Sequence, residues 1–338
     1  MTKKMQAVLT TTAGGPEVLE LTDVPLPWPG RGEDVLVRLK ACALNPADSF
    51  FRSFGPYIES DNPFILGHDG AGIIEDVGAD VSDFAPGDEV CFCNGGLGET
   101  PGTYAEFAIV PQSQLARKSA SVSFAEAAAL PLVLITCWES LYERVDIQPQ
   151  EFALIHGGAG GTGHMAVQLA ALRGGHVAAT VSSDEKAEFV RSLGVEKPIF
   201  YDREDFVDVA RTWTADRGLD VALDNVGAVA LQKTYRAMAP YGRIATLMGT
   251  PADDADETAY VNNLTIHNVM MLTPMVLKLH DRLAAQATIV DLGMKLLSEQ
   301  KIKVHIADTF DLKDIRAAHE RLDAGGAMGK IVINIGLK

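Results

Sequence analysis

The chain has 338 residues, a length that favours two domains with separate hydrophobic cores over a single domain. Hydrophobic residues make up 47% of it and charged residues 22%, which are the proportions of a packed globular protein and not of a disordered or fibrous chain. The formal net charge of −16 argues against a nucleic-acid partner, because phosphate binding requires clustered lysine and arginine.

The first residues lack the continuous apolar core of a secretory signal, and no run approaches the ~18 apolar residues of a membrane span. We therefore expect a cytoplasmic protein with no membrane partner. Its four cysteines are Cys42, Cys91, Cys93 and Cys137, which lack the spacing of a disulfide framework. We expect them to be reduced.

Short alternating or β-branched runs dominate the first 125 residues and predict a β module with few helices. The predicted strands are 6–9, 35–41, 72–77, 89–93 and 104–110. After Ser123 the pattern becomes helical, with predicted helices at 124–130 and 132–142. Ser123 and Glu126 have the spacing of a capping box before the first of these helices.

From residue 152 onward strands alternate with helices, which predicts an α/β domain with a doubly wound parallel sheet. The predicted strands are 152–156, 177–181, 198–201, 221–225 and 242–247, and the predicted helices are 163–173, 185–193, 206–214 and 229–238. The last stretch contains predicted helices 276–300 and 312–323 and predicted strands 304–310 and 330–335. These last two strands either extend the same sheet or return to the first module.

A glycine-rich turn joins the predicted strand 152–156 to the helix that follows. Gly158, Gly160 and Gly163 match G-x-G-x-x-G, in which the glycines allow a tight turn, the approach of a pyrophosphate and helix–strand contact. Gly161 and Thr162 lie in the same turn, just before a helix whose free N–H groups bind phosphate. A flexible turn is the alternative, but the order strand, turn, helix favours a dinucleotide. The turn does not end in Lys-Ser or Lys-Thr, so it does not fit the phosphate loop of an ATPase.

The end of the second strand of this domain indicates which dinucleotide binds. NAD enzymes usually place a carboxylate there to hold the ribose 2′-hydroxyl, whereas this chain has Ser182, followed by Ser183 and Lys186. A serine hydroxyl and a lysine ammonium suit a 2′-phosphate, which favours NADPH over NADH. Alternatively, Ser182 is an ordinary turn residue and Lys186 a solvated one. Asp184 lies nearby and weighs against NADPH.

Several motifs together resemble those of the zinc-independent quinone oxidoreductases, a branch of the medium-chain dehydrogenase/reductase superfamily. They are Asn45-Pro46-Ala47-Asp48, Leu66-Gly67-His68-Asp69-Gly70-Ala71-Gly72, Pro86-Gly87-Asp88-Glu89-Val90, Leu130-Pro131-Leu132, Gly157 to Gly163 and Gly329-Lys330-Ile331-Val332. The resemblance runs from residue 6 to residue 335.

This resemblance implies a GroES-like catalytic domain formed by residues 1–125, a Rossmann NADPH-binding domain at 126–272, and a C-terminal segment, 273–338, that returns to the catalytic domain. It implies that Thr136 approaches the nicotinamide, and that Lys186 and Tyr201 approach the 2′-phosphate. Asn225, Gly249 and Lys330 would lie along the cofactor. Tyr201 could equally cover the edge of the sheet, and Thr136 could bond its own helix backbone.

The alcohol dehydrogenase branch of this superfamily binds zinc through a cysteine, a histidine and a further cysteine or aspartate. Here Asn45 stands where the first cysteine would be, and Leu132 lies near the position of the third ligand. Only His68 remains, so we expect no metal. An atypical ligand set of Cys42, His68 and Asp69 is the alternative.

Without a Lewis acid, hydride addition is easier to a quinone or an α,β-unsaturated carbonyl than to a simple ketone, because the resulting anion is delocalised. The sequence therefore predicts an NADPH-dependent reductase of quinones or enones. Asn45 is the candidate for donating or orienting a hydrogen bond, Asp48 for holding its loop, and Tyr57 for donating a hydrogen bond or a proton. A turn at Asn45 and a helix cap at Asp48 would explain the same residues.

Three further hypotheses concern an aromatic cluster, the chemical class and the assembly. Phe50, Phe51, Phe54 and Tyr57 form either an aromatic wall for a planar acceptor or part of the core.

The alternative functions are a zinc alcohol dehydrogenase with atypical ligands and a non-catalytic NADPH-binding protein. The segment 264–272 resembles the edge strand through which relatives dimerise, so we expect a homodimer, an internal strand being the alternative.

Overall fold

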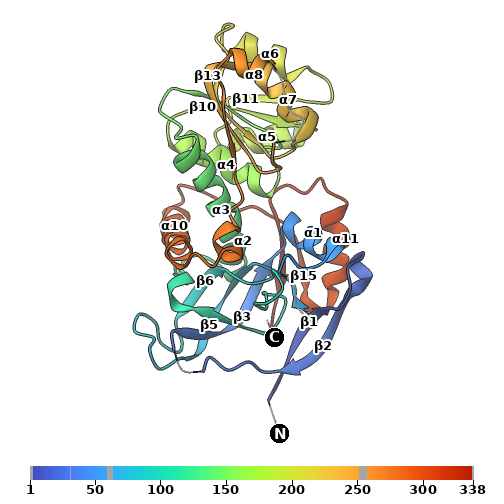
Figure 1. Cartoon of the computed structure of the whole chain (residues 1–338), viewed down its shortest axis with the longest axis vertical. Helices are drawn as coiled ribbons and strands as arrows, with labels where there is room; N and C mark the ends of the chain where they lie inside the picture. The colour runs from blue at the N-terminus through green and yellow to red at the C-terminus, as the bar shows by residue number, and fades with distance from the viewer. Residues whose placement is uncertain (1–2, 31, 59–63, 251–256, 337–338) are drawn as a thin grey trace. The chain divides into compact units, whose positions relative to one another are not determined.

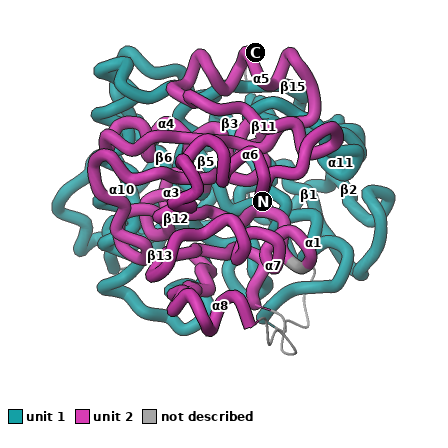
Figure 2. Tube along the Cα trace, turned by 90° about the horizontal axis from the view of Figure 1, so that it is seen from above, with its two compact units in different colours: residues 1–132, 272–338 teal, residues 133–271 magenta. Residues whose placement is uncertain are grey.

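The computed structural model describes residues 3–30, 32–58, 64–250 and 257–336 (Figure 1). The chain divides into two compact units, with residues 1–132 and 272–338 in unit 1 and residues 133–271 in unit 2 (Figure 2). The C-terminal strands, for which the sequence leaves two places, belong to unit 1. In the described part of the chain, no helix has the length and apolar character needed to cross a membrane.

Unit 1 contains two β-sheets. The larger has the order β15-β16-β3-β5-β6-β8, with β7 paired to β3, and the smaller has the order β2-β1-β4. The strands are β1 (Lys4–Thr10), β2 (Leu19–Pro25), β3 (Asp34–Ala43), β4 (Phe64–Ile65), β5 (Asp69–Val77), β6 (Glu89–Cys93), β7 (Phe107–Pro111), β8 (Ala116–Arg117), β15 (Ile306–Asp311) and β16 (Lys330–Asn334). β3 pairs with β5 along one edge and with β7 and then β16 along the other, so most of its residues are buried. Its carboxyl end therefore provides a rigid base for the residues that follow.

The helical segments of unit 1 are mostly short. They are η1 (Pro16–Val18), α1 (Pro46–Phe54), η2 (Gln112–Gln114), α2 (Phe124–Ala129), α9 (Thr273–Val276), α10 (His280–Ser298), η4 (Leu312–Asp314) and α11 (Ile315–Asp323). The predicted capping box of α2 is confirmed, since Ser123 N–H donates to Glu126 at 3.0 Å and Glu126 N–H donates to Ser123 Oγ at 3.2 Å.

The predicted helix over 276–300 is confirmed as α10, which begins four residues later than predicted and ends at Ser298. The structure has α9 and α10 with a break between them, in which Lys278 has a φ of 52°. That left-handed conformation cannot continue an α-helix. The apolar periodicity of the sequence continues through the break, which is why the pattern does not reveal it.

Unit 2 is a six-stranded parallel sheet with the order β11-β10-β9-β12-β13-β14, which confirms the doubly wound prediction. Its strands are β9 (Phe152–Ile155), β10 (His176–Val181), β11 (Lys197–Phe200), β12 (Leu219–Asp224), β13 (Met238–Thr246) and β14 (Thr265–Asn268). Its helices are α4 (Gly161–Leu172), α5 (Asp184–Ser192), α6 (Phe206–Trp213), α7 (Ala228–Ala237) and α8 (Glu257–Val261). α3 (Pro131–Trp138) and the π-helix η3 (Glu139–Arg144) precede β9. The strand order reverses between β10 and β12, so β9 marks the switch point where this fold binds its ligands.

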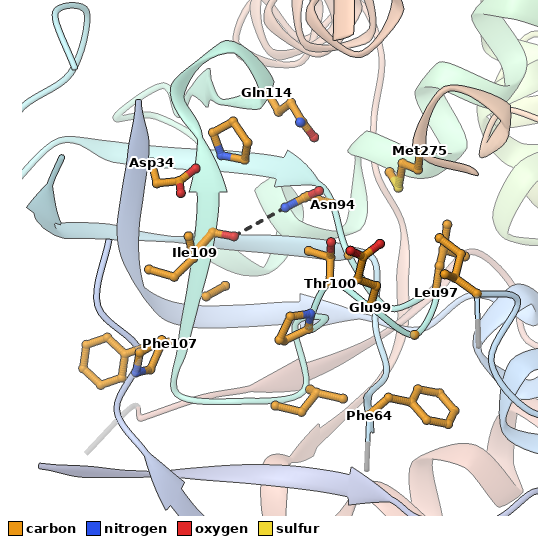
Figure 3. A pocket seen from close by; sticks show the side chains of 18 of the residues that line it. Asp34, Phe64, Asn94, Leu97, Glu99, Thr100, Phe107, Ile109, Gln114 and Met275 are labelled. Atoms are coloured by element: carbon orange, nitrogen blue, oxygen red, sulfur yellow. Dashed lines mark hydrogen bonds between the residues drawn. The ribbon is translucent and has the colours of Figure 1, made fainter. Parts of the chain in front are cut away.

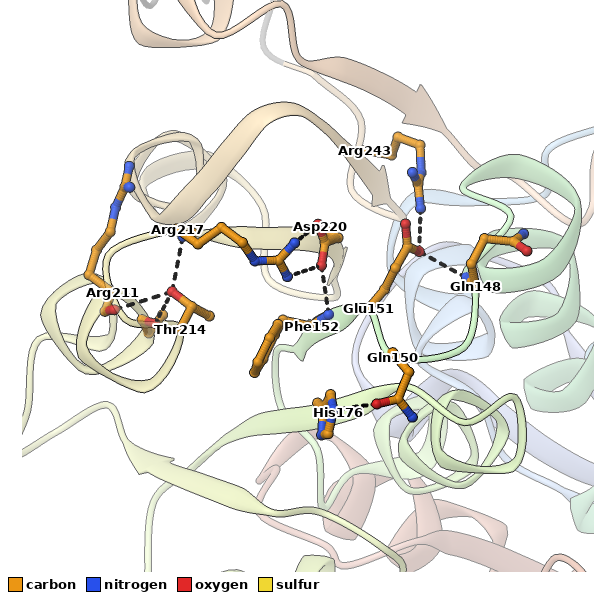
Figure 4. Close-up of polar contacts among 12 residues, drawn as sticks. Gln148, Gln150, Glu151, Phe152, His176, Arg211, Thr214, Arg217, Asp220 and Arg243 are labelled. Atoms are coloured by element: carbon orange, nitrogen blue, oxygen red, sulfur yellow. Dashed lines mark hydrogen bonds and ion pairs between the residues drawn. The ribbon is translucent and has the colours of Figure 1, made fainter.

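Polar contacts at the amino ends of β9 and β12 fix the sheet of unit 2 (Figure 4). Asp220 accepts a hydrogen bond from the Phe152 N–H at 2.8 Å and forms an ion pair with Arg217. Glu151 pairs with Arg243 of β13. These contacts fix the amino ends of the two strands.

Candidate functional site

The glycine-rich turn lies between the carboxyl end of β9 and the start of α4, as predicted. Gly157 has a φ of 62°, and its N–H donates to Thr180 Oγ1 at 2.8 Å. Gly160 is the N-cap of α4 and offers no side-chain cap, so the first N–H groups of the helix keep their capacity to bind an anion.

The space around the three motif glycines fits a dinucleotide. A Cβ on Gly163 would overlap the carbonyl oxygen of Gly157, and a Cβ on Gly158 would lie 2.6 Å from the Cβ of Ala179. These two glycines are therefore required by packing within unit 2. A Cβ on Gly160 would meet nothing closer than 3.4 Å, so this position is open on the side from which a pyrophosphate would approach.

The carboxyl end of β10 carries the residues predicted to select the cofactor. Lys186 Nζ donates to Ser182 Oγ at 3.0 Å, and Ser183 is the N-cap of α5, accepting from the Lys186 N–H at 3.2 Å. Asp184, which weighed against NADPH in the sequence, is 3.5 Å from Arg203. Arg203 lies over the Phe200 ring at 4.7 Å from its centroid. No sequence pattern singles out Arg203, because it lies in an ordinary-looking loop after β11.

Asn225 follows β12 and has one unpartnered atom. Its Nδ2 donates to the His156 carbonyl at 2.8 Å, whereas its buried Oδ1 has no hydrogen-bond partner among the described residues. A buried acceptor without a partner is costly, so a donor from a bound molecule, such as a ribose hydroxyl, would satisfy it. This atom is the second observation in unit 2 that fits a nicotinamide dinucleotide.

The remaining predicted cofactor residues of unit 2 differ in exposure. Gly161 and Thr162 form the first turn of α4, and Thr136 is buried on α3. Tyr201 is exposed at the end of β11, and Gly249 has a φ of 76° with open space where a side chain would be. Contacts of these residues with a cofactor stay predictions.

In unit 1, the carboxyl end of β3 leads into a buried polar cluster of Asn45, Asp69 and Lys330. Asn45 Nδ2 donates to Asp69 Oδ2 at 2.9 Å, and the Lys330 ammonium donates to Asn45 Oδ1 and lies 3.3 Å from Asp69 Oδ2. Asp69 Oδ1 also accepts from the Leu132 N–H at 2.8 Å. The amide of Asn45 is therefore already bonded at both ends, which suits orienting Lys330 better than donating to a further group. Lys330, predicted along the cofactor, belongs to this cluster.

Asp48 faces His68 beside that cluster. Asp48 Oδ2 accepts from the Asn45 N–H at 2.8 Å, which is the capping-box contact at the start of α1 and corresponds to the helix-cap alternative for this residue. Its other oxygen lies 3.6 Å from His68 Nε2, and His68 Nδ1 donates to the Gly95 carbonyl at 2.6 Å. Both side chains are fully buried, and burial raises the pKa of Asp48 while the nearby His68 opposes that rise.

A chain of hydrogen bonds, in which the donors and acceptors can be assigned, supports α1. Arg52 donates to Asp323 at 2.8 Å and to His319 Nδ1 at 2.9 Å, and His319 Nε2 is 3.1 Å from the Tyr104 hydroxyl. Because a guanidinium can only donate, His319 must be neutral with its proton on Nε2. Burial, followed by the charge of Arg52, lowers the pKa of His319 to about 3, in agreement with that assignment.

The aromatic residues after Asp48 divide between core and surface. Phe51 is buried and meets the His68 ring edge-on at 5.8 Å, whereas Phe50, Phe54 and Tyr57 are exposed. Phe51 therefore belongs to the core, and the other three are available to a ligand. Tyr57 is 52% exposed, and its role as a donor stays a prediction.

The described residues contain no group of three or more His, Cys, Asp and Glu side chains arranged to hold a metal. His68 Nδ1 and both oxygens of Asp69 are engaged by other groups, and Cys42 is buried with its thiol pKa raised by desolvation. Of these groups, His68 Nε2 has no hydrogen-bond partner among the described residues and faces Asp48 Oδ1 at 3.6 Å. A lysine ammonium supplies the positive charge in this cluster.

The two units and their sites define a nucleotide-dependent oxidoreductase with a GroES-like domain. Residues 31–120 match the family model of the alcohol dehydrogenase GroES-like domain, and residues 193–333 match that of the zinc-binding dehydrogenases. The chain belongs to the medium-chain dehydrogenase/reductase superfamily, in its zinc-independent quinone oxidoreductase branch. Members of this superfamily bind a nicotinamide cofactor.

Three relatives illustrate the similarity. A 2-haloacrylate reductase of Burkholderia sp is 30% identical over 97% of this chain and 98% of its own length. The quinone oxidoreductase structure from Pseudomonas syringae has a TM-score of 0.87 and 31% identity, covering 98% of this chain and 99% of that one. The mycobacterial protein Rv1454c, solved in complex with NADPH, has a TM-score of 0.84 and 26% identity, covering 98% of this chain and 99% of that one.

Proposed function

We propose that this protein is an NADPH-dependent reductase that transfers hydride to a neutral quinone or α,β-unsaturated carbonyl without a metal. The observation that carries this proposal is the Asn45, Asp69 and Lys330 cluster, in which a buried ammonium contacts Asn45, the residue that by resemblance stands at a zinc-ligand position of the alcohol dehydrogenases. The names of quinone oxidoreductase relatives support the acceptor class.

The choice of NADPH rests on the end of β10. Ser182 and Lys186 present a hydroxyl and an ammonium 3.0 Å apart, and the carboxylate that would repel a 2′-phosphate, Asp184, is paired with Arg203. The Lys186 ammonium and the Ser182 hydroxyl then serve the phosphate, because a charged donor beside a hydroxyl suits phosphate oxygens. A relative solved with NADPH supports the same choice.

When bound, the nicotinamide supplies the hydride. The role of unit 1 in the proposed mechanism is to stabilise the oxyanion that hydride addition creates. Lys330 holds a positive charge that is only 3% exposed, and such a fixed charge acts strongly in a site poor in water. Asn45 and Asp69 fix its position, and the exposed Tyr57 is the available donor near α1.

The same cluster argues for neutral acceptors over acrylates. Lys330 can offset the one transient negative charge of the oxyanion, but a substrate carboxylate would add a permanent second one. A 2-haloacrylate, the substrate class in the name of one relative, would bring a second carboxylate close to Asp69 and Asp48. We therefore expect uncharged quinones and enones to be reduced faster than acrylates.

The first experiment follows NADPH absorbance after addition of 1,4-benzoquinone, 9,10-phenanthrenequinone or a simple enone to chelator-treated protein, with ethanol and NADP⁺ as the contrasting pair. Acceptor-dependent NADPH oxidation that survives chelation is the expected result. Activity only with alcohols and added zinc would contradict the proposal in favour of an alcohol dehydrogenase. Tight NADPH binding without turnover of any acceptor would contradict it in favour of a binding protein.

A second experiment tests the cofactor. Lys186→Ala should raise the KM for NADPH by about tenfold or more, because a charge-assisted contact to phosphate contributes roughly 1.5–3 kcal/mol. The KM for NADH should change little. Lys197→Ala, a change on β11 of the same unit, is the matched control and should leave both values near wild type. An equal change for both cofactors would count against a 2′-phosphate contact.

We further propose that the protein forms a homodimer through β14. This strand ends the described order of the sheet in unit 2 and pairs with β13 on one side. An edge strand exposes unpaired N–H and C=O groups, which a second copy can satisfy. Light scattering on the eluting protein should give twice the chain mass, and Ile266→Pro should reduce it to that of one chain. A monomeric wild type would contradict this proposal.

A further inference from the structure

Unit 1 contains a pocket of about 860 Å³ apart from the polar cluster described above (Figure 3). Asn45, Asp48, His68, Asp69 and Lys330 are not among the residues that line it. Its walls come from β1, β2, β7, the loop 94–101 and the start of α10. Apolar side chains dominate the lining, among them Met5, Phe64, Leu97, Ile109, Met275 and Leu283. This volume lies within the range of about 300–1,000 Å³ that is typical of small-molecule sites.

One polar atom on the wall of this pocket has no partner. Gln114, at the end of η2, is only 8% exposed, and its Oε1 is buried without a hydrogen bond from any described residue. Gln112, two residues earlier, has its Oε1 engaged by the N–H groups of Ser82 at 3.1 Å and Asp83 at 3.3 Å. The Oε1 of Gln112 therefore makes structural hydrogen bonds, whereas the Oε1 of Gln114 makes none with the described residues. A buried acceptor of this kind calls for a donor from a bound molecule.

The charged residues that line the pocket indicate which net charge a bound molecule can carry. Glu99 pairs with Lys278 at 2.9 Å, which leaves Asp34 as the unbalanced charge among the described lining residues. An anion is therefore disfavoured. Asn94 is also 8% exposed and provides a second amide on the wall of the pocket. Its Nδ2 donates a long, weak hydrogen bond of 3.4 Å to the Ile109 carbonyl (Figure 3).

We infer that this pocket binds a neutral, largely apolar small molecule that donates an O–H or N–H hydrogen bond to Gln114 Oε1. An alkylphenol has this chemistry. The occupant would also contact the loop that orients His68, because Gly95 lines the pocket and its carbonyl accepts the His68 Nδ1 proton at 2.6 Å. Occupancy of the pocket therefore modulates the reductase through that loop.

A pair of ligands that differ only in the donor tests this inference. We would measure binding of 4-hexylphenol and of its methyl ether, 4-hexylanisole, to the full-length protein saturated with NADPH, using titration calorimetry. The phenol should bind with one site per chain and at least tenfold more tightly than the ether. Because the readout is binding, it applies whether or not the protein turns over a quinone, and so it separates this inference from the proposed function.

Two variants complete the test. Gln114→Met keeps the size of the side chain but removes the acceptor, so the phenol should bind no better than the ether. Ile109→Trp should fill the pocket and abolish binding of both ligands. Each variant must keep wild-type NADPH affinity and thermal midpoint to be counted as folded.

Steady-state kinetics locate the ligand relative to the acceptor. If the protein reduces quinones, the phenol should change kcat without competing with the quinone. Equal affinity of the phenol and the ether for the wild type would overturn the inference. So would binding that survives Ile109→Trp, or purely competitive inhibition against the quinone, since either places the ligand elsewhere.

Discussion

At the scale of single residues, the contacts of Lys330 in the structure differ from those expected from the sequence. The sequence places it on a motif and assigns it to the cofactor only by resemblance, whereas the structure buries its ammonium between Asn45 and Asp69. No spacing rule predicts that contact, because Lys330 and Asn45 are 285 residues apart in the chain. The sequence indicated the turn at Asn45-Pro46 but not the hydrogen-bond partners of the Asn45 side-chain amide.

Lys330→Met should destabilise the protein by about 3–5 kcal/mol, because it leaves the fully buried Asp69 carboxylate without its charge partner. The measurement is the free energy of unfolding in urea at pH 7. Lys301→Met removes a surface pair with Glu299 and serves as the control, with a much smaller expected loss because solvent screens that pair. Similar losses in both variants would mean that Lys330 is not held by a buried ion pair.

His319 makes stability depend on pH. Its folded pKa of about 3 lies below the unfolded value of about 6.5, so below pH 6.5 the unfolded chain binds a proton that the folded chain refuses. Stability should therefore fall as the pH drops from 6.5 towards 3, with a contribution from this group of about 1.4 kcal/mol per pH unit.

Urea unfolding at pH 7 and pH 5 measures this dependence. His319→Gln cannot titrate, so the difference between the two pH values should shrink relative to wild type. His156, whose pKa burial lowers to about 4, is present in both proteins and does not confound the comparison. An unchanged difference would show that His319 is protonated in the folded state.

At the scale of elements, the β9–turn–α4 unit was predictable because each step of it is local. The strand, the glycines and the helix are adjacent in sequence, so the pattern alone gives their order. The break between α9 and α10 was not predictable, because the apolar repeat continues through it and only the φ of Lys278 reveals it. β2 was also missed, since just one of its seven residues is buried and its pattern resembles a loop.

Two glycine variants separate the packing of this element from its function. Gly163→Ala would force a Cβ into the carbonyl oxygen of Gly157 and should lower the thermal midpoint of the protein. Gly160→Ala meets nothing closer than 3.4 Å and should fold normally, yet its methyl group should obstruct the pyrophosphate and weaken NADPH binding by tenfold or more. Calorimetric binding together with thermal unfolding measures both effects. Normal NADPH affinity in Gly160→Ala would place the pyrophosphate elsewhere.

At the scale of the whole molecule, alternation of strands and helices predicted the parallel sheet, and the chain length predicted more than one core. The pairing of the last strands was open in the sequence, because β15 and β16 suit either sheet in their hydrophobicity. Burial decides it: β16 pairs with β3 through Val332, Ile333 and Asn334, and the first two of these are fully buried. Local sequence patterns do not predict which strands pair when the strands lie near opposite ends of the chain.

The two units should respond differently to NADPH. Trp138 and Trp213 lie in unit 2, whereas Trp28 lies in unit 1 and is 73% exposed. In Trp28→Phe, fluorescence reports only unit 2. NADPH at 100 times its Kd should raise the free energy of unfolding seen by these tryptophans by about 2.7 kcal/mol. A double variant, Trp138→Phe with Trp213→Phe, reports unit 1 and should show a smaller rise, because the glycine turn and the Ser182–Lys186 pair are in unit 2. Equal rises would mean that the two cores unfold as one cooperative unit, and no rise in either would contradict NADPH binding itself.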